Sequence, residues 1–399
     1  MLIHNITLQN LLSFGPDGMD LPLRPLNVLI GPNGSGKSNL IEAISLLQAA
    51  PRNLASAVRE SGGIGDWLWK GAKNPVAMLQ VVVESPDGDK QLRHLLAFTK
   101  NSQRFEFFDE RIEDANSDKP FSYYWVDHDR GWAAPMDDES CKMRASVPNL
   151  VLAPHSQDLQ DESDRTQSVL SRLKDPQRFP QISYLAKQYE RIRIYRDWSF
   201  GHNTPPRQPQ RADQENDFLR EDFANLGLVL NRFEQEPALK AQVLENLSQL
   251  YPGVDNFGGS SIGDDFVQVF IQEENFTVPA TRLSDGTLRY LCLLALLCHP
   301  KPPPLMCIEE PELGLHPDVM PTIAELLKDA STRSQLIVST HSQVLVDALS
   351  FSPEDVVVCE KQDGQSTMQR LDAEELKVWL EKYALGQLWR RGDIGGNRW

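Results

Sequence analysis

The sequence predicts an α/β fold in which a mixed central sheet is joined to an antiparallel β subdomain and carries a helical insertion. Three observations predict this fold. A short apolar run at 26–30 stops at a glycine-rich loop, and helical spacing follows over 39–50, which is the pattern of strand, loop and helix. Hairpin patterns come next along the chain. Beyond residue 266, apolar strands alternate with helices, as in sheets whose parallel strands are connected by helices.

The first part of the chain, 1–157, is expected to contain the first half of the main domain and the β subdomain. It opens with an irregular strand marked by Ile3, Ile6, Leu8 and Phe14, and a turn follows at 15–18. The turn composition of 86–89 predicts a hairpin. The strands expected in the subdomain are 78–84, 92–98, 105–108, 123–126 and 150–152.

The middle of the chain, 158–249, changes to helical spacing and is expected to form a helical insertion or lid. A proline-rich break at 205–209 interrupts it, and no heptad pattern is sustained, which excludes a long coiled-coil arm. The last part, 250–399, is expected to complete the main domain after a turn-rich stretch at 255–265. Its expected elements are strands 266–271, 305–308 and 335–339 and helices 287–297 and 322–328.

Composition indicates an acidic protein without a membrane segment. The 399 residues include 40 Lys or Arg and 56 Asp or Glu, and the net charge of −16 argues against non-specific coating of nucleic acid. The longest apolar stretch, 288–298, is too short to cross a bilayer, and the N-terminus does not read as a secretory signal. The five cysteines form no CxxC pair, so neither disulfides nor a zinc site is expected. A cytoplasmic location without a membrane partner is predicted.

Two neighbouring segments depart from the average charge. Residues 165–211 include ten Lys or Arg and three Asp or Glu, whereas 109–164 include fourteen acidic and five basic residues. The basic segment is interpreted either as a docking face for a partner or for double-stranded DNA, or as a solvated surface. Its arginines of interest are Arg191, Arg193, Arg196, Arg207 and Arg211.

Residues 31–38, with the sequence GPNGSGKS, satisfy the phosphate-binding pattern GxxxxGK[ST] in its required context of strand and helix. The glycines allow successive backbone N–H groups to point at phosphate oxygens, and the following helix adds the positive end of its dipole. Lys37 is expected to neutralise the β and γ phosphates, and the Ser38 hydroxyl is expected to hold Mg²⁺. The motif therefore predicts a P-loop NTPase.

Residues 305–310, LMCIEE, form an apolar strand that ends in two carboxylates. Such a strand can place its two carboxylates beside a site that binds phosphate and magnesium. Glu309 is expected to hold the magnesium shell, and Glu310 to orient or deprotonate the attacking water. Taken alone, two glutamates at a strand end are also a common start of a loop.

Two further positions suit the same chemistry. Ser284 and Gly286 lie in the turn LSDGT before an apolar helix, where a hydroxyl and backbone N–H groups form an anion site; the plain alternative is a helix N-cap. His341 follows the apolar strand 335–339, where an imidazole could contact a γ-phosphate. A lone histidine at such a place is otherwise a structural residue.

The four motifs GPNGSGKS, LSDGT, CIEEPELGLHP and STHS, in that order, resemble Walker A, the signature, Walker B with the D-loop, and the switch histidine of ABC-type ATPase heads. Asn33, Asn39, the opening NLLSF and the EPE followed by GLHP look like the RecF/SMC-like branch, including OLD-family and related predicted ATPases of bacterial defence systems. No glutamine can be assigned as the Q-loop residue, because Gln157 and Gln167 both remain candidates.

This resemblance implies an ATPase whose two copies sandwich two ATP molecules with Mg²⁺. Lys37, Glu310 and His341 are then the catalytic residues, and Ser38 and Glu309 hold the metal. Ser284 and Gly286 would act on the nucleotide of the other copy. The nucleotide-binding residues implied are Gly31, Asn33, Gly34, Ser35, Gly36, Lys37, Ser38, Asn39, Ser284 and Gly286.

The resemblance also implies a role in which ATP-driven dimerisation and hydrolysis control DNA engagement or a separately encoded effector, in bacterial anti-phage defence. Only 58 residues follow His341, too few for a metal-binding Toprim domain, so any nuclease or Toprim-like activity is expected in another subunit. The alternatives are a RecF-like DNA repair or recombination ATPase, and an ATP-gated regulatory switch without DNA contact.

Overall fold

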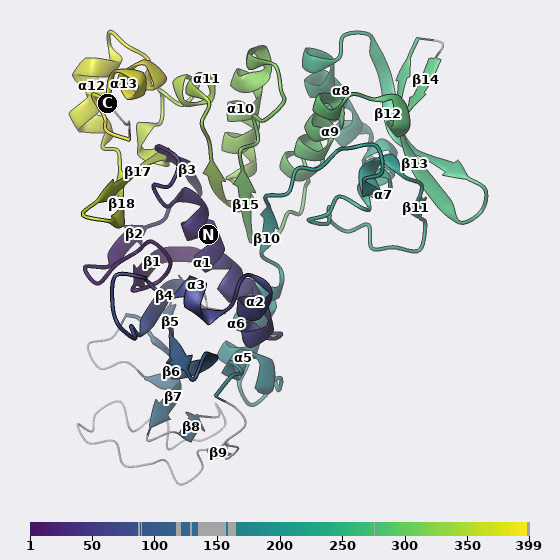
Figure 1. Cartoon of the computed structure of the whole chain (residues 1–399). Helices are drawn as coiled ribbons and strands as arrows, with labels where there is room; N and C mark the ends of the chain where they lie inside the picture. Colours follow the sequence, from purple (N-terminus) through teal and green to yellow (C-terminus); the bar gives the residue numbers. More distant parts are fainter. Residues whose placement is uncertain are drawn as a thin grey trace.

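The computed structural model describes residues 1–396 except 87, 89, 117–120, 128–129, 135–156, 159–164 and 275. Two large sheets organise these residues, and a smaller sheet lies beside helices α7 (Leu226–Gln235) and α8 (Pro237–Leu250) (Figure 1). The α/β class with a mixed sheet, an antiparallel subdomain and inserted helices is confirmed. Within the described residues, no helix is both long and apolar enough to span a membrane.

The central sheet has six strands, and all neighbours run parallel except the last pair. Its apolar strands are buried along their length because helices or a second sheet cover both faces. The edge strand at one side comes from the middle segment, which the sequence analysis treated as helical only. In spatial order the strands are β10 (Arg193–Tyr195), β15 (Leu305–Glu309), β16 (Gln335–Ser339), β3 (Leu26–Ile30), β17 (Val356–Gln362) and β18 (Gln365–Arg370).

The second sheet is antiparallel and forms the predicted β subdomain. The expected opening strand is shorter than its apolar residues suggested, because the chain turns after Gln9. The expected strand at 150–152 lies outside the described residues. In spatial order the strands are β2 (Met19–Pro22), β1 (Ile3–Gln9), β4 (Ala77–Glu84), β5 (Gln91–Asn101), β6 (Arg104–Asp114), β7 (Ser122–Asp127), β8 (Arg130–Ala133) and β9 (Gln157–Asp158).

Two hydrophobic cores lie on opposite faces of the central sheet because side chains alternate along each strand. Leu29, Cys307 and Ile337 face one core, which they share with α1, α6 and the antiparallel sheet. Val28, Ile308 and Val338 face the other core, which includes α7, α8, α9 (Asp285–Leu297) and α10 (Met320–Ala330). The helices on the first core are α1 (Lys37–Ala49), α2 (Leu54–Glu60), α3 (Ile64–Trp67), α5 (Val169–Arg172) and α6 (Pro180–Glu190).

The second core is covered by longer helices and by the C-terminal pair. Helix α9 is buried from Thr287 to Leu297, which explains why most of its side chains are apolar on every face. The helices on this side are α7 (Leu226–Gln235), α8 (Pro237–Leu250), α9 (Asp285–Leu297), α10 (Met320–Ala330), α11 (Gln343–Asp347), α12 (Ala373–Leu380) and α13 (Leu385–Arg391).

The prediction of a turn-rich stretch at 255–265 was wrong, because most of it is strand β12 (Val254–Ile262). β12 pairs with β13 (Phe266–Glu273), which also pairs with β11 (Gln210–Arg211) and β14 (Phe276–Pro279). Helix α7 packs on β12, and a Cβ on Gly259 would lie 2.4 Å from the carbonyl oxygen of Gly227. The glycines that suggested turns therefore allow a helix to approach a strand closely.

Candidate nucleotide-binding site

The glycine-rich loop connects β3 to α1 and has the backbone conformation that glycine permits. Gly31, Gly34 and Gly36 have φ values of 146°, 81° and 104°. A Cβ on Gly31 would lie 2.1 Å from the carbonyl oxygen of Cys359, and one on Gly36 would lie 2.4 Å from Ser366 Oγ. No larger residue fits at these two positions without displacing β17 or β18.

Lys37 lies inside this loop. Its ammonium group donates to the carbonyl oxygens of Gly31 at 2.7 Å and Pro32 at 3.1 Å, and the residue is 6% exposed. Burial lowers the pKa of Lys37, and the neighbouring Cys359, Glu310, Glu309 and Glu312 oppose that shift. The lysine is thus held across the loop, where a phosphate chain would compete for its charge.

The remaining loop residues differ in their surroundings. Asn33, Gly34 and Ser38 are exposed, whereas the buried Ser35 hydroxyl has no hydrogen-bond partner among the described residues. Asn39 donates to Ser13 Oγ at 2.7 Å, which also accepts from Ser366 Oγ at 2.6 Å. These hydrogen bonds therefore connect the start of α1 to the N-terminal loop and to β18.

Ser38 and Glu309 meet at the carboxyl edge of the central sheet. Ser38 Oγ lies 3.4 Å from Glu309 Oε2. Burial raises the pKa of Glu309, while Arg196 and the Ser38 hydroxyl act in the opposite direction. A hydroxyl and a carboxylate are oxygen donors that suit Mg²⁺, which usually keeps several waters and needs few protein ligands. Among the described residues, no cluster of three His, Cys, Asp or Glu could hold a metal by itself.

Glu310 and His341 also meet at this edge, with 3.7 Å between Glu310 Oε1 and His341 Nε2. Glu310 has φ 46°, a left-handed conformation that is unusual for glutamate, and its N–H donates to the carbonyl oxygen of Ser339 at 2.9 Å. Glu312 accepts a 2.7 Å hydrogen bond from the His341 N–H. Burial lowers the pKa of His341, and the charge of Lys37 acts in the same direction.

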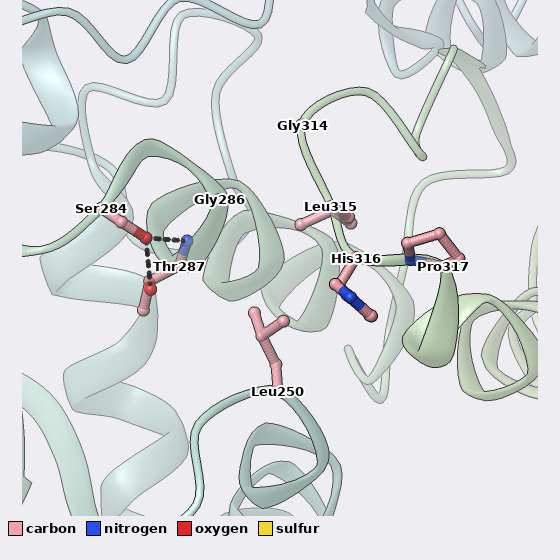
Figure 2. A pocket seen from close by; sticks show the side chains of 8 residues that line it. All are labelled: Leu250, Ser284, Gly286, Thr287, Gly314, Leu315, His316 and Pro317. Atoms are coloured by element: carbon pink, nitrogen blue, oxygen red, sulfur yellow. Dashed lines mark hydrogen bonds between the residues drawn. The ribbon is translucent and has the colours of Figure 1, made fainter.

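Ser284 and Gly286 lie at the start of α9, and no hydrogen bond within the described residues joins them to the glycine-rich loop. The Ser284 hydroxyl accepts from the Thr287 N–H at 3.1 Å, so Ser284 is the N-cap of α9. A Cβ on Gly286 would lie 2.9 Å from the carbonyl oxygen of Gly314. These residues line an open pocket of about 560 Å³, with Leu250 and His316 among its other walls (Figure 2).

Three residues at the site were not assigned to it from the sequence. Arg196 follows β10 and pairs with Glu42, and its Nε lies 3.8 Å from Glu309 Oε1. Trp198 Nε1 donates to the carbonyl oxygen of Glu309 at 2.7 Å. The Arg289 guanidinium lies 5.0 Å from the Trp198 ring. The signal that could have identified Arg196 is its position directly after a strand. Once that strand is recognised, the residue after it is expected at the carboxyl edge of the sheet.

The arginines of the basic segment differ in their exposure and contacts. Arg207 is 6% exposed and donates to the carbonyl oxygens of Phe200, Ala280 and Leu283. Arg193 donates to the carbonyl oxygens of Glu190 and Ile192, and Arg211 pairs with Asp213. Of the five arginines, Arg191 alone is exposed without an ion pair in the described part of the chain. Three of the five, Arg196, Arg207 and Arg211, are therefore paired with carboxylates of the chain.

The two candidate glutamines lie away from the sheet edge that carries Glu309. Gln157 belongs to β9, at the end of the antiparallel sheet, and pairs with Ala133. Gln167 is exposed just before α5. Arg196, directly after the strand beside β15, stands next to Glu309 instead.

A family model described as "AAA domain, putative AbiEii toxin, Type IV TA system" matches residues 26–347. No curated protein sequence matches the chain. A crystal structure of the Smc head bound to the C-winged helix domain of ScpA is 15% identical, with a TM-score of 0.57 over 94% of this chain and 99% of that chain. The Smc head domain with an extended coiled coil bound to the C-terminal domain of ScpA, from Pyrococcus furiosus, is 14% identical, with a TM-score of 0.55 over 96% and 99%. At these identities the likeness shows the fold alone, which is that of an ABC-type, SMC-like head.

Proposed function

The chain belongs to this AAA domain family, and from that premise we propose that it hydrolyses ATP with Mg²⁺ while two copies close around the nucleotide. Closure and hydrolysis would control a separately encoded effector, such as a nuclease or Toprim-like subunit. The role in anti-phage defence rests on the resemblance to defence ATPases.

The observation that carries the proposal is the meeting of four side chains at one sheet edge beside the glycine-rich loop. Ser38 and Glu309 supply oxygens 3.4 Å apart, and Glu310 and His341 stand 3.7 Å apart next to them. Lys37 lies across the loop, where it can turn from two backbone carbonyls to phosphate oxygens.

In the proposed reaction each group has a separate task. Bound Mg²⁺ neutralises charge on the β and γ phosphates. Ser38 and Glu309 hold the metal, directly or through its water. Glu310 orients or deprotonates the attacking water, and His341 contacts the γ-phosphate from the next strand end.

The signature residues support closure of two copies. Ser284 and Gly286 make their contacts with Thr287 and Gly314 and line their own open pocket. An exposed N-cap at the start of a helix attracts an anion, so a phosphate presented by a second copy suits this pocket. In this proposal 158–249 acts as the lid between the two parts of the head.

Control of an effector is favoured over a DNA clamp because Arg196, Arg207 and Arg211 of the basic segment are each paired with a carboxylate of the chain. A sequence-independent DNA clamp needs free cations for the phosphates. An ATP-gated switch without DNA contact agrees with the same observation and remains the second candidate. DNA-stimulated turnover would favour the clamp over both.

Calorimetric titration with ATP and Mg²⁺ tests the nucleotide site. Lys37→Ala should abolish binding while circular dichroism stays that of wild type, because Lys37 bonds only loop carbonyls. Lys377→Ala, which removes an exposed lysine on α12, is the matched control and should bind normally. Retained affinity in Lys37→Ala would overturn the assignment of the loop.

Phosphate release tests the proposed hydrolysis of ATP and the role of Glu310 in it. Glu310→Gln should bind ATP and release almost no phosphate, because it loses the group that activates water. Glu325→Gln, the same change on the exposed side of α10, should release phosphate at the wild-type rate. Equal rates in the two variants would remove Glu310 from the mechanism.

A further inference from the structure

The guanidinium at the end of β10 lies beside the carboxylate proposed to hold the metal. β10 and β15 run parallel with Tyr195 opposite Ile308, so Arg196 and Glu309 follow at adjacent strand ends. Arg196 Nε lies 3.8 Å from Glu309 Oε1. Glu309 Oε2, the other oxygen of that carboxylate, lies 3.4 Å from Ser38 Oγ. One carboxylate thus stands between an arginine and the metal-binding hydroxyl.

A second carboxylate completes this cluster. Arg196 Nη1 donates to Glu42 Oε2 on α1. Glu42 is four residues after Ser38, so both side chains project from the same face of that helix. Arg196 is therefore the cation that separates two carboxylates, Glu42 and Glu309, which would otherwise repel each other.

The hydrogen bonds of Arg196 are incomplete. Its Nε and Nη2 atoms are buried and have no hydrogen-bond partner among the described residues. Buried donors on a charged group destabilise a structure unless they are satisfied, so this arrangement favours a state in which an acceptor moves toward them. Glu309 already lies on the Nε side at ion-pair distance. Arg196 and Glu309 are thus close enough for an ion pair, but they are not hydrogen-bonded.

We propose that Arg196 is a positioning residue for Glu309: it is the counter-ion of that carboxylate when no metal is present, and it competes with Mg²⁺ for it. The proposal rests on the proposed ATPase function and specifies how its metal site is regulated. Arg196 holds Glu309 in place for the metal and sets the concentration of Mg²⁺ that is needed. Glu42 holds the other side of the guanidinium and so limits the competition.

The charges predict opposite effects for the two partners. Arg196→Gln removes a nearby positive charge and frees Glu309, so half-saturation with Mg²⁺ should need about fivefold less of the ion. Turnover at saturating Mg²⁺ should fall about tenfold or more, because Glu309 is no longer held in place. Glu42→Gln releases Arg196 toward Glu309 and should raise the Mg²⁺ requirement about fivefold.

The Mg²⁺ requirement is measured without hydrolysis, in a Glu310→Gln background, from the binding of a fluorescent ATP analogue at increasing Mg²⁺. Complexation of the analogue by Mg²⁺ is the same in every sample, so differences in midpoint report on the protein. Arg193→Gln is the matched control, because Arg193 lies on β10, three residues before Arg196, and bonds backbone carbonyls. Its midpoint should not move. Turnover is compared in variants with Glu310 intact.

A lower midpoint with slower turnover in Arg196→Gln, together with a higher midpoint in Glu42→Gln, supports the proposal. An unchanged or raised midpoint in Arg196→Gln overturns it, as does a lowered midpoint in Glu42→Gln. Arg196→Lys keeps the charge and provides a second test if the glutamine variant does not fold, because its midpoint should stay within about twofold of the wild-type value. Loss of analogue binding in every variant and in the Glu310→Gln parent would instead count against the ATPase proposal.

Discussion

Arg207 Nη1 donates a 2.7 Å hydrogen bond to the backbone carbonyl oxygen of Leu283, the residue before Ser284. The same guanidinium donates to Ala280 and Phe200 and pairs with Asp285, the first residue of α9. One buried side chain therefore fastens the signature turn to the loop that follows β10. That loop also contains Trp198, which bonds the carbonyl oxygen of Glu309. The turn at Leu283 and strand β15 are thus joined through a short segment of the same chain.

We predict that Arg207→Ala lowers the free energy of unfolding by about 2–4 kcal/mol, because three buried carbonyl oxygens lose their donor. Urea denaturation measures the change. Arg211→Ala is the control: its pair with Asp213 is exposed, and its loss should leave the free energy of unfolding close to the wild-type value. Similar losses in the two variants would mean that Arg207 is a surface residue in solution.

The parts of the candidate site that can be located from the sequence are those defined by local patterns. The geometry of a glycine-rich loop depends on residues within eight positions, and the strand before it and the helix after it are both visible in the pattern. Strand ends such as Glu309 and His341 follow from apolar runs. The edge at which they gather follows from parallel pairing.

The contacts missed by sequence reasoning join distant segments. Arg196 meets Glu309 across 113 positions of the chain, and no local pattern shows that its strand is a sheet edge. The burial of Arg207 was missed because its partners, three backbone carbonyl oxygens and Asp285, lie up to 78 positions away in the chain. β12 was missed because its glycines serve close packing by α7.

That packing predicts a measurable loss in Gly259→Ala. The added Cβ would lie 2.4 Å from the Gly227 carbonyl oxygen and from Val267 Cγ1, and a backbone cannot move aside cheaply. We expect the free energy of unfolding to fall by about 1–3 kcal/mol. Gly65→Ala is the control, since a Cβ there meets nothing within 4 Å. If thermal and urea unfolding of Gly259→Ala match the control, α7 does not pack this closely on β12.

The stability of the chain should fall below neutral pH because of His299. Burial lowers its pKa from 6.5 to about 4, with the charge of Arg232 acting in the same direction, and its ring packs against Phe218 and Phe233. The folded state holds this imidazole neutral, so the unfolded state binds more protons between pH 6.5 and 4. The contribution is complete above pH 6.5 and is lost as the pH falls, by up to about 3 kcal/mol.

His299→Gln measures this contribution because glutamine does not titrate. The unfolding free energies of wild type and variant are compared in urea at pH 7.5 and at pH 4.5. Wild type should lose about 2 kcal/mol more than the variant over this range. A difference that is independent of pH would show that His299 is protonated equally in both states.

The last prediction joins the two halves of the proposed shared site. Glu310→Gln should retain ATP and Mg²⁺ but not hydrolyse them, so a closed dimer should accumulate with ATP. Adding Ser284→Arg should prevent closure, because a large cation would fill the pocket at the start of α9, whereas the P-loop of the same chain still binds ATP. Light scattering with and without ATP gives the masses.

Ser284→Arg also removes the N-cap of α9, which costs about 1 kcal/mol. Asp372→Ala in the Glu310→Gln background controls for that loss, because Asp372 caps α12 in the same way and should leave the dimer intact. An ATP-dependent dimer that persists in the Ser284→Arg double variant would reduce Ser284 to a helix cap, and closure would then have to use another surface.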